Sequence, residues 1–177
     1  MGTGRPSRPS VEPCPTMPRL TDISRNLGAF LDMLAVSEGT STIAGSDDGY
    51  NVLVGGTLID GYAAHPRRVV WLPRYQIRSS AAGRYQFLTR TWDDLAKRLG
   101  LQDFSPAAQD RAAIQLIRER RALTDINAGR IPEAIDHCRS IWASLPGAGY
   151  GQREHTLDRL LAAYIRAGGT LTYKVGS

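Results

Sequence analysis

Glu38 is the side chain whose place in the sequence best suits catalysis. A helix before it is predicted by apolar residues at i, i+3, i+4 and i+7, namely Leu27, Phe30, Leu31 and Leu34. Gly39 ends this helix, so Glu38 lies in its last turn, at the negative end of the backbone dipoles. The dipoles and the apolar neighbours both disfavour the ionised carboxylate, so we expect a raised pKa. A carboxyl group protonated near neutral pH can serve as the general acid of glycosidic cleavage, although spacing alone leaves an exposed surface acid as the alternative.

Residues 81–86 are a second candidate segment, because they combine a glycine with two side chains suited to sugars. Gly83 lets a backbone or a sugar ring approach closely. Tyr85 offers an apolar face, and the Gln86 amide suits saccharide hydroxyl and acetamido groups. We expect both side chains to line a glycan site, the alternative being a loop-to-helix junction with Tyr85 in the core.

Two stretches without helical periodicity are predicted to be surface loops of the kind that often carry function. Residues 66–80 mix prolines and arginines with Trp71 and Tyr75. A second, glycine-rich loop presents Tyr150 and is followed by Gln152. No Lys-Ser or Lys-Thr pair follows its glycines, which excludes a phosphate-binding loop. A lip that presents Tyr150 to a ligand and a plain interhelical turn both fit this loop.

The other reactive residue types do not form a metal or redox motif. The two cysteines, Cys14 and Cys138, lie far apart and not in a Cys-x-x-Cys pair. The histidines His65, His137 and His155 lack the spacing of metal ligands. No Ser/His/Asp or Cys/His set with a nucleophile elbow is recognisable. We therefore expect neither a metal nor a cofactor.

The elements that must position these residues are mainly helical. A Gly55-Gly56 pair between two β-prone runs predicts a small hairpin over residues 50–59. Ser105 and Pro106 are a favoured N-cap and first helical residue. Besides the helix already described, apolar spacing predicts four helices, over residues 85–99, 106–117, 132–142 and 153–168. The predicted class is α+β, with one small antiparallel sheet.

Length and composition favour one globular domain. The chain has 177 residues, of which 42% are hydrophobic and 22% charged, enough to bury a core. Residues 1–22 are rich in Pro, Ser and Arg and are predicted to be a flexible extension before a domain at 23–177. The apolar stretch at 29–36 is too short to span a bilayer, so we expect no membrane insertion. The net charge of +5 favours an anionic partner without choosing one, and no nucleic-acid-binding motif accompanies it.

Several of these segments occur in the same order in one known family. Over roughly residues 26–169 the chain resembles the bacteriophage lambda endolysin family. The motifs that carry the resemblance are SEGT at 37–40 with the apolar run before it, VGG at 54–56, HPR at 65–67, AGRYQ at 82–86, DFSP at 103–106 and IWASLPGAGYGQ at 141–152. The last motif is long enough to be highly specific.

This resemblance implies a lysozyme-like fold with a glycan-binding cleft for the domain at 23–177, and the activity of a peptidoglycan lytic transglycosylase. It implies that Glu38 is the single catalytic acid. It also implies that the loops around residues 68–77 and 146–152 form the two lips of the cleft. The side chains expected to contact the glycan are Tyr75, Tyr85, Gln86, Tyr150 and Gln152, together with Trp71, an aromatic residue that the lambda lip lacks.

The implied reaction cleaves the β-1,4 bond between N-acetylmuramic acid and N-acetylglucosamine and closes a 1,6-anhydro ring on the muramoyl product. A hydrolytic lysozyme would usually need a second carboxylate, for which Asp47, Asp48 and Asp60 are the candidates. A non-catalytic peptidoglycan-binding module is a further alternative, which the intact Glu38 disfavours.

The family resemblance also sets expectations about partners and place of action. We expect a monomer that binds glycan strands of the bacterial wall and no nucleic acid. The chain lacks an apolar signal segment. It is therefore expected to accumulate in the host cytoplasm and to reach the periplasmic wall after a separate membrane protein, a holin, permeabilises the membrane.

Overall fold

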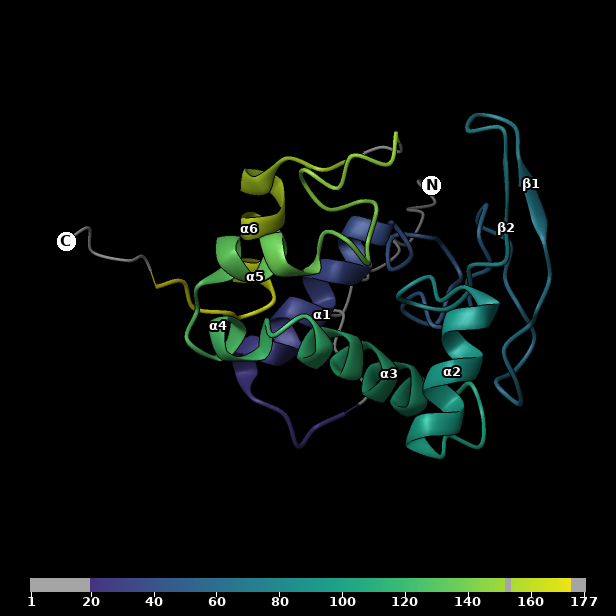
Figure 1. The fold of residues 1–177 in the computed structure, drawn as a ribbon, viewed down its shortest axis with the longest axis horizontal. Coiled ribbons are helices and arrows are strands. Elements are labelled where there is room, and N and C mark those ends of the chain that lie inside the picture. The colour runs from purple at the N-terminus through teal and green to yellow at the C-terminus, as the bar shows by residue number, and fades with distance from the viewer. Residues whose placement is uncertain (1–19, 152–153, 173–177) are drawn as a thin grey trace, which may run out of the picture.

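The computed structural model describes residues 20–151 and 154–172. Figure 1 shows a helical part containing α1, α4, α5 and α6, a second part with α2 and a projecting β-hairpin, and α3 running between them. In chain order the elements are α1 (Arg25–Glu38), β1 (Val70–Leu72), β2 (Ile77–Ser79), α2 (Thr89–Leu99), α3 (Pro106–Glu119), α4 (Leu123–Asn127), α5 (Ile131–Cys138) and α6 (Leu157–Arg166). The α+β class predicted from the sequence is confirmed.

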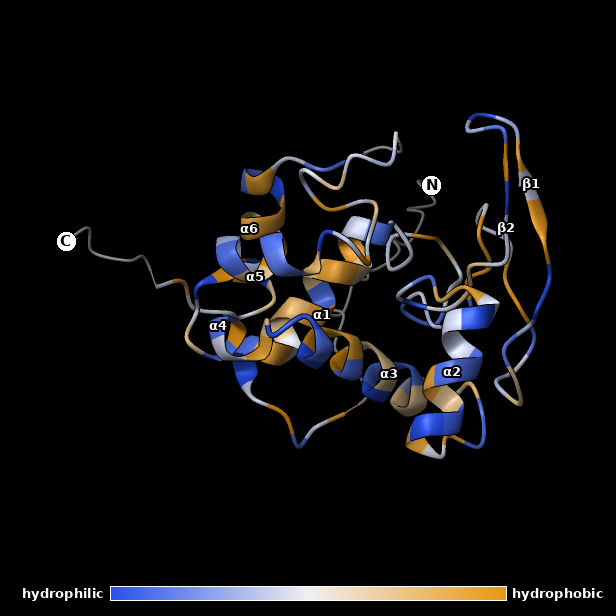
Figure 2. Cartoon of the chain, in the orientation of Figure 1, coloured by the Kyte–Doolittle hydropathy of each residue, from blue (hydrophilic) through white to orange (hydrophobic). Residues whose placement is uncertain are grey.

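Helix α1 is the central element of the core. Its N-cap Ser24 accepts a hydrogen bond from the backbone N–H of Leu27, which satisfies one of the donors at the helix start. α4 and α6 pack against it, and hydrophobic residues occupy much of its length in Figure 2. The side chains of α1 that are completely buried are Phe30, Leu31, Met33, Leu34 and Ala35. Because close packing encloses α1 on several sides, the residue at its C-terminus is held firmly in place.

An aromatic cluster joins the segment before the hairpin to α2 and α3. The rings of Trp92 and Phe104 meet edge to face with their centroids 4.6 Å apart. Burial lowers the pKa of His65, which is therefore neutral near pH 7. Its Nδ1 accepts from the Arg67 N–H, so its Nε2 carries the proton and donates to the Phe87 carbonyl at 2.8 Å. His65 is thus a structural residue that fixes the base of the hairpin.

The sheet lies elsewhere than the sequence predicted. β1 and β2 pair antiparallel within the stretch expected to be a loop, with Trp71 opposite Arg78. Residues 50–59, where the hairpin was expected, turn back on themselves with an isolated bridge between Val52 and Leu58, but they form no strand, and Leu53 pairs with Ala82 instead. The prediction was wrong because Val52 is drawn into the core instead of extending a ribbon. In the observed hairpin, Pro73 falls in the turn, where its missing N–H costs no ladder bond.

Several helix boundaries also differ from those predicted. α2 begins at Thr89 and not at Tyr85, because residues 82 and 87 pair as a β-bridge around a tight turn. α5 ends at Cys138, so the buried Trp142 lies in the turn that follows it. α6 begins at Leu157, where Thr156 caps it, and α4 was not predicted at all because five residues carry too little periodicity.

The predicted division at residue 22 stays a prediction. Residues 1–19 lie outside the described part, whereas Leu20 is half-buried and its N–H donates to Asp110 Oδ2 at 3.1 Å. In the described ranges, none of the helices has the length and apolar character that crossing a bilayer requires.

Candidate active site

Glu38 is the last residue of α1, as predicted. Gly39 follows in the left-handed conformation, with φ of 72°, and its N–H donates to the carbonyl of Val36. Glycine adopts this conformation without the steric cost that a Cβ would add, so the chain turns sharply away from the helix. The Glu38 side chain is half-buried where the enclosed helix ends.

The surroundings of Glu38 favour its protonated form. Burial raises the pKa of Glu38 from its usual 4.5 to about 7. The hydroxyl of Ser144 donates to Glu38 Oε1 at 2.6 Å and opposes part of this rise, because it stabilises the carboxylate. A group with a pKa near 7 can donate a proton in one step and accept one in the next at neutral pH.

The chain directly after Glu38 is fixed by Thr40. This buried side chain donates from Oγ1 to the backbone carbonyl of Arg84 at 2.7 Å. Gly49 packs against the same side chain, since a Cβ there would lie 2.7 Å from Thr40 Oγ1. These contacts connect the loop after α1 to the AGRYQ segment at 82–86.

The side chain of Arg84 connects the AGRYQ segment to α1 and to the loop after α1. Its guanidinium is completely buried and pairs with Asp32 on α1 and Asp48 in the loop after α1, each at 2.5 Å. Burial raises the pKa of Asp32 to about 7, although Arg84 acts against the rise. Displacing a buried arginine from its two carboxylates would leave charges without partners in the interior, at a high cost in free energy. The ion pairs therefore hold α1, the loop after it and the AGRYQ segment in one arrangement.

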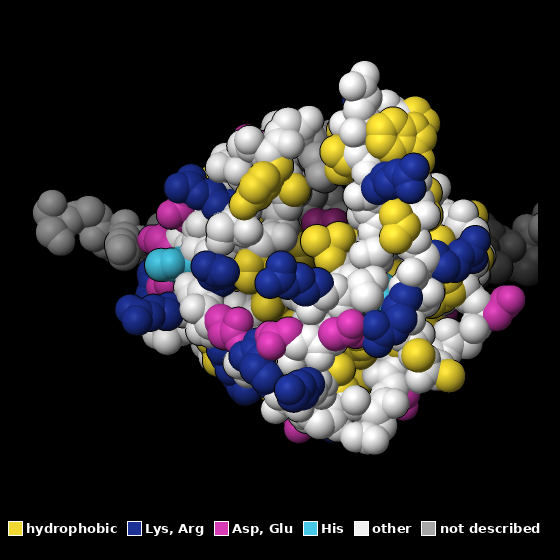
Figure 3. Space-filling view, turned by 45° about the vertical axis from the view of Figure 1, so that its right-hand side comes forward, with side chains coloured by type: hydrophobic (Ala, Val, Ile, Leu, Met, Phe, Trp, Pro, Cys, Tyr) yellow, Lys and Arg dark blue, Asp and Glu magenta, His cyan; other side chains and the backbone are white. Residues whose placement is uncertain are grey.

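Two raised lobes flank a hollow on one face of the protein. Figure 3 shows hydrophobic and basic side chains on both lobes and an acidic side chain at depth between them. In Figure 1 the β1–β2 hairpin and the loop between α5 and α6 rise on either side of this region. Trp71, 51% exposed, lies on the hairpin, and Tyr150, 58% exposed, lies on the opposite loop with its hydroxyl donating to the Ser140 carbonyl. The two predicted lips therefore exist as separate projections.

Trp71 lies on the face of the hairpin that is turned away from Gly55. The side chains of Val70 and Leu72 lie over Gly55, since a Cβ there would be 3.8 Å and 3.9 Å from their methyl groups. Because side chains alternate along a strand, Trp71 and its cross-strand partner Arg78 point to the opposite face. Tyr75, in the turn of the hairpin, is half-buried with Arg74 over its ring at 5.6 Å.

Tyr85 does not lie where a sugar contact requires. Its side chain is 1% exposed, and its hydroxyl donates to Asp110 Oδ1 at 2.7 Å. The expected glycan contact by this side chain is therefore contradicted by its burial, and the alternative of a core residue holds. Gln86 is half-buried, with its amide nitrogen donating to the Gly83 carbonyl at 2.9 Å. Gln152 lies outside the described residues.

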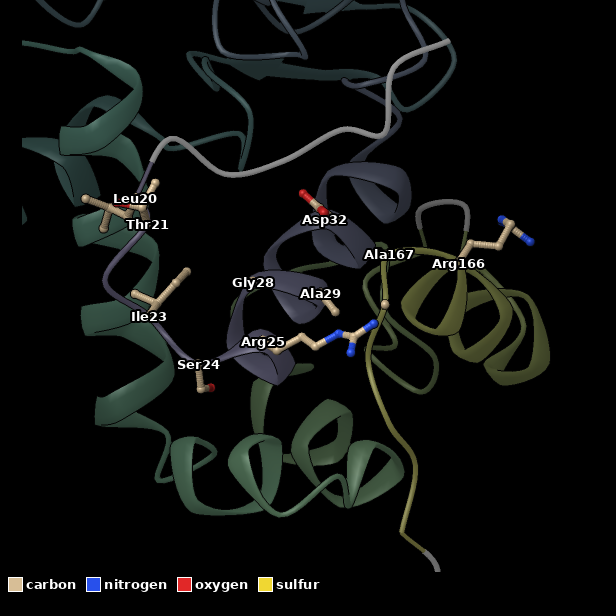
Figure 4. A pocket seen from close by; sticks show the side chains of 11 residues that line it. Leu20, Thr21, Ile23, Ser24, Arg25, Gly28, Ala29, Asp32, Arg166 and Ala167 are labelled. Atoms are coloured by element: carbon tan, nitrogen blue, oxygen red, sulfur yellow. The ribbon is translucent and has the colours of Figure 1, made fainter. Parts of the chain in front are cut away.

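A separate cavity lies away from Glu38, near the start of α1. It has a volume of about 430 Å³ between the N-terminal half of α1 and the end of α6, as Figure 4 shows. Its lining includes Leu20, Arg25 and Ala167. Along α1 its lining runs from Arg25 to Asp32, ends about 9 Å before Glu38 along the helix axis and does not include Glu38. This cavity is therefore distinct from the candidate site.

Two important site residues were not singled out from the sequence, Ser144 and Arg84. Both fall within motifs that carried the family resemblance, but a serine in a loop and an arginine beside a glycine give no signal of burial or partner. Metal binding is not favoured in the described ranges, where no three His, Cys, Asp or Glu side chains gather closely enough to hold an ion.

Comparison with known proteins decides the family. Residues 28–171 match the family model described as Endolysin. The chain belongs to the endolysin family. The endolysin of Escherichia phage lambda is 52% identical over 154 residues, covering 86% of this chain and 97% of that protein. The endolysin of Escherichia phage P2 is 53% identical over 157 residues, covering 82% and 94%.

Solved structures of the endolysin family agree with this assignment. Bacteriophage lambda lysozyme complexed with a chitohexasaccharide superposes with a TM-score of 0.82 at 51% identity, covering 86% of this chain and 100% of that chain. A second structure of lysozyme from bacteriophage lambda gives a TM-score of 0.79 at 50% identity over the same shares. The lysozyme-like fold is thus confirmed, and the chain is an endolysin-type enzyme that cleaves glycosidic bonds of peptidoglycan.

Proposed function

We propose that this endolysin is a lytic transglycosylase in which Glu38 acts alone, first as acid and then as base. The observation that carries the proposal is the half-buried carboxyl group at the end of α1, whose pKa burial raises to about 7. At neutral pH a large fraction of such a group is protonated, as the first step requires.

The proposed reaction has two proton transfers and consumes no water. Glu38 donates its proton to the glycosidic oxygen between N-acetylmuramic acid and N-acetylglucosamine, and the C1–O bond breaks through an oxocarbenium-like state. The Glu38 carboxylate then takes the proton of the muramoyl C6 hydroxyl. That oxygen bonds to C1 and closes the 1,6-anhydro ring, which returns Glu38 to its starting form.

The candidate second carboxylates have other contacts. Asp48 pairs with the buried Arg84. Asp47 Oδ2 accepts a hydrogen bond of 2.7 Å from the Tyr62 hydroxyl. Asp60 is exposed on the surface. These positions support a mechanism with one carboxylate over hydrolysis with two.

A glycan chain is the proposed occupant of the hollow between the lobes. The similar lambda lysozyme was solved with a chitohexasaccharide, which supports this choice. Exposed aromatic faces suit sugar rings, so Trp71 and Tyr150 are the proposed contacts on the two lobes. Tyr75 and Gln86 are proposed to add contacts nearby, and Gln152 stays a prediction from the sequence.

The proposed setting is the wall of the infected host. We expect a monomer, because one chain supplies the acid and both lobes. Access to the wall is proposed to depend on a holin, as the resemblance to phage endolysins suggests.

Mass spectrometry of released muropeptides tests the proposal. Purified Gram-negative peptidoglycan is digested with wild type and with Glu38→Gln, and Glu119→Gln on the far end of α3 serves as the control. Wild type and the control should release products one water lighter than hydrolysis gives, without reducing ends. Glu38→Gln should lose activity by about 100-fold to 10,000-fold. Ordinary reducing ends would indicate a hydrolase, and an active Glu38→Gln chain would exclude Glu38 as the acid.

A further inference from the structure

The two oxygens of the Glu38 carboxyl group have different surroundings. Oε1 accepts the hydrogen bond from the Ser144 hydroxyl at 2.6 Å. Among the described residues this is the one hydrogen bond of the Glu38 side chain, and it does not involve Oε2. The carboxyl group is therefore held by one oxygen, and the other remains for chemistry.

Ser144 is itself held by a second serine. Ser37 precedes Glu38 on α1, is 4% exposed, and its Oγ lies 2.8 Å from Ser144 Oγ. A serine hydroxyl has one proton to donate. While Ser144 donates that proton to Glu38 Oε1, Ser37 is left as the donor in its contact with Ser144.

The backbone around Ser144 is anchored on both sides. Trp142 is buried, and its Nε1 donates to the Tyr85 carbonyl at 3.2 Å. Leu145 is completely buried, and the Ser144 carbonyl accepts from the His155 N–H at 3.0 Å. Ser144 is thus placed by the core and not by a mobile loop tip.

We propose that Ser37 and Ser144 are a positioning pair that keeps Glu38 Oε1 a hydrogen-bond acceptor and so confines the catalytic proton to Oε2. The inference rests on the proposed role of Glu38 and adds which of its two oxygens does the work. In this order of donors the Ser144 proton points toward Oε1. In the reverse order, with a proton on Oε1 donating to Ser144 and Ser144 donating to Ser37, the buried Ser37 hydroxyl would have no acceptor among the described residues. Ser144 also fixes the rotation of the carboxyl group, so that Oε2 meets the glycosidic oxygen in the same orientation in each turnover.

The charged groups on the elements around Glu38 are engaged elsewhere. Asp32 on α1 and Asp48 in the loop after it face Arg84, and Asp47 accepts from Tyr62. On the opposite lobe, Glu154 accepts from the N–H groups of Gly147 and Gly149. Burial and the Ser144 hydrogen bond are the two influences on the Glu38 pKa, so a change at Ser144 should show directly in its titration.

The test compares Ser144→Ala, Ser144→Thr and Ser37→Ala with wild type. Ser140→Ala is the matched control. Ser140 lies four residues before Ser144, its side chain is exposed, and its contact with Tyr150 is made by its backbone carbonyl, which the substitution keeps. The rate of peptidoglycan cleavage is measured from pH 4 to pH 10, and the Glu38 carboxyl is titrated by carbon NMR. Thermal unfolding of each variant shows whether it is folded.

Ser144→Ala removes a hydrogen bond to the ionised Glu38 carboxylate. The apparent pKa of Glu38 should therefore rise by about 1 unit, and kcat should fall by about 10-fold to 100-fold. Ser37→Ala should move it the same way by less, Ser144→Thr should restore it, and Ser140→Ala should match wild type. A folded Ser144→Ala chain with the wild-type pH profile and kcat would overturn the inference. The failure of this inference is distinguishable from the failure of the proposed function. An unchanged Ser144→Ala chain would exclude the serine pair, whereas only an active Glu38→Gln chain would exclude Glu38 as the catalytic acid.

Discussion

The guanidinium of Arg84 lies 2.5 Å from Asp32 Oδ1, a contact between the AGRYQ segment and the middle of α1. Arg84 also pairs with Asp48, and its backbone carbonyl accepts from Thr40. One residue therefore ties the helix that carries Glu38 to the loop that follows it. The active-site geometry depends on this buried group, although Arg84 is not exposed to substrate.

Arg84→Met is expected to destabilise the protein by about 3–5 kcal/mol, because it leaves the buried Asp32 and the half-buried Asp48 without their partner. The loss should be larger at pH 8 than at pH 5. The pKa of Asp32 lies near 7, so the group is mostly protonated at pH 5 and mostly charged at pH 8. Urea unfolding at both pH values measures the difference. Arg67→Met, which breaks the exposed pair with Asp93, should cost about 1 kcal/mol or less, and an equal cost at both sites would contradict the prediction.

Glu38→Gln is expected to stabilise the protein at alkaline pH. The folded-state pKa of Glu38 is raised to about 7, so the stability linked to its protonated form is complete below pH 4.5 and is lost as the pH rises through 7. The neutral amide of glutamine does not ionise, so it avoids this loss in the free energy of unfolding. The loss is about 2 kcal/mol at pH 8 after allowance for partial exposure of the side chain. Thermal unfolding should show a gain at pH 8 and little change at pH 4.

The matched control for that experiment is Glu119→Gln. The hydrogen bonds from Gln115 and Arg98 lower the pKa of Glu119, so its carboxylate form favours the folded state. Its replacement should give no gain at pH 8 and a small loss. The same stabilisation in both variants would point to a general charge effect and not to the burial of Glu38.

Gly49→Ala is expected to impair both stability and activity. Gly49 has φ of 85°, and an added Cβ would lie 2.7 Å from Thr40 Oγ1, which anchors the chain after Glu38. We expect a loss of about 2–4 kcal/mol and a lower kcat. Gly61→Ala is the control, because its φ of 75° is similar but no atom lies within 4 Å of the added Cβ. Its loss should be about 1 kcal/mol with normal kcat, and equal effects of the two variants would rule out the Thr40 contact as the cause.

Trp71→Ala is expected to weaken glycan binding without unfolding the protein. Half of the side chain is exposed, so little core is lost. Loss of a stacking face should raise the KM for peptidoglycan by about 10-fold, while kcat changes less because Glu38 is untouched. Ile165→Ala on α6, where the side chain is 53% exposed, controls for loss of a surface apolar group. A wild-type KM for Trp71→Ala would remove this residue from the glycan site.

The sequence predicted the elements whose periodicity is strong and local. Leu34 and its neighbours marked α1 and hence the placement of Glu38 at a helix end, and Ser105 marked the start of α3. The hairpin was misplaced because the observed strands are only three residues long and lie in a stretch whose prolines and arginines indicated a loop, whereas Val52 of the predicted hairpin packs into the core.

The site was predicted less completely than the fold. Tyr85 illustrates why, since its type suits both a sugar platform and a buried hydroxyl donor, and the choice depends on Asp110, 25 residues away. Ser144 is likewise 106 residues from Glu38, and no spacing rule links them. The family motifs included both residues without stating what either one contacts.

Digestion of peptidoglycan in water enriched in the heavy oxygen isotope tests the central claim most directly. The muropeptides released by the wild-type chain are weighed by mass spectrometry beside those from ordinary water. If Glu38 takes the proton of the muramoyl C6 hydroxyl and the C6 oxygen bonds to C1, the products should carry no heavy oxygen and should be anhydro forms. Incorporation of one heavy oxygen at a new reducing end would show that water is the nucleophile and would contradict the single-carboxylate transglycosylase.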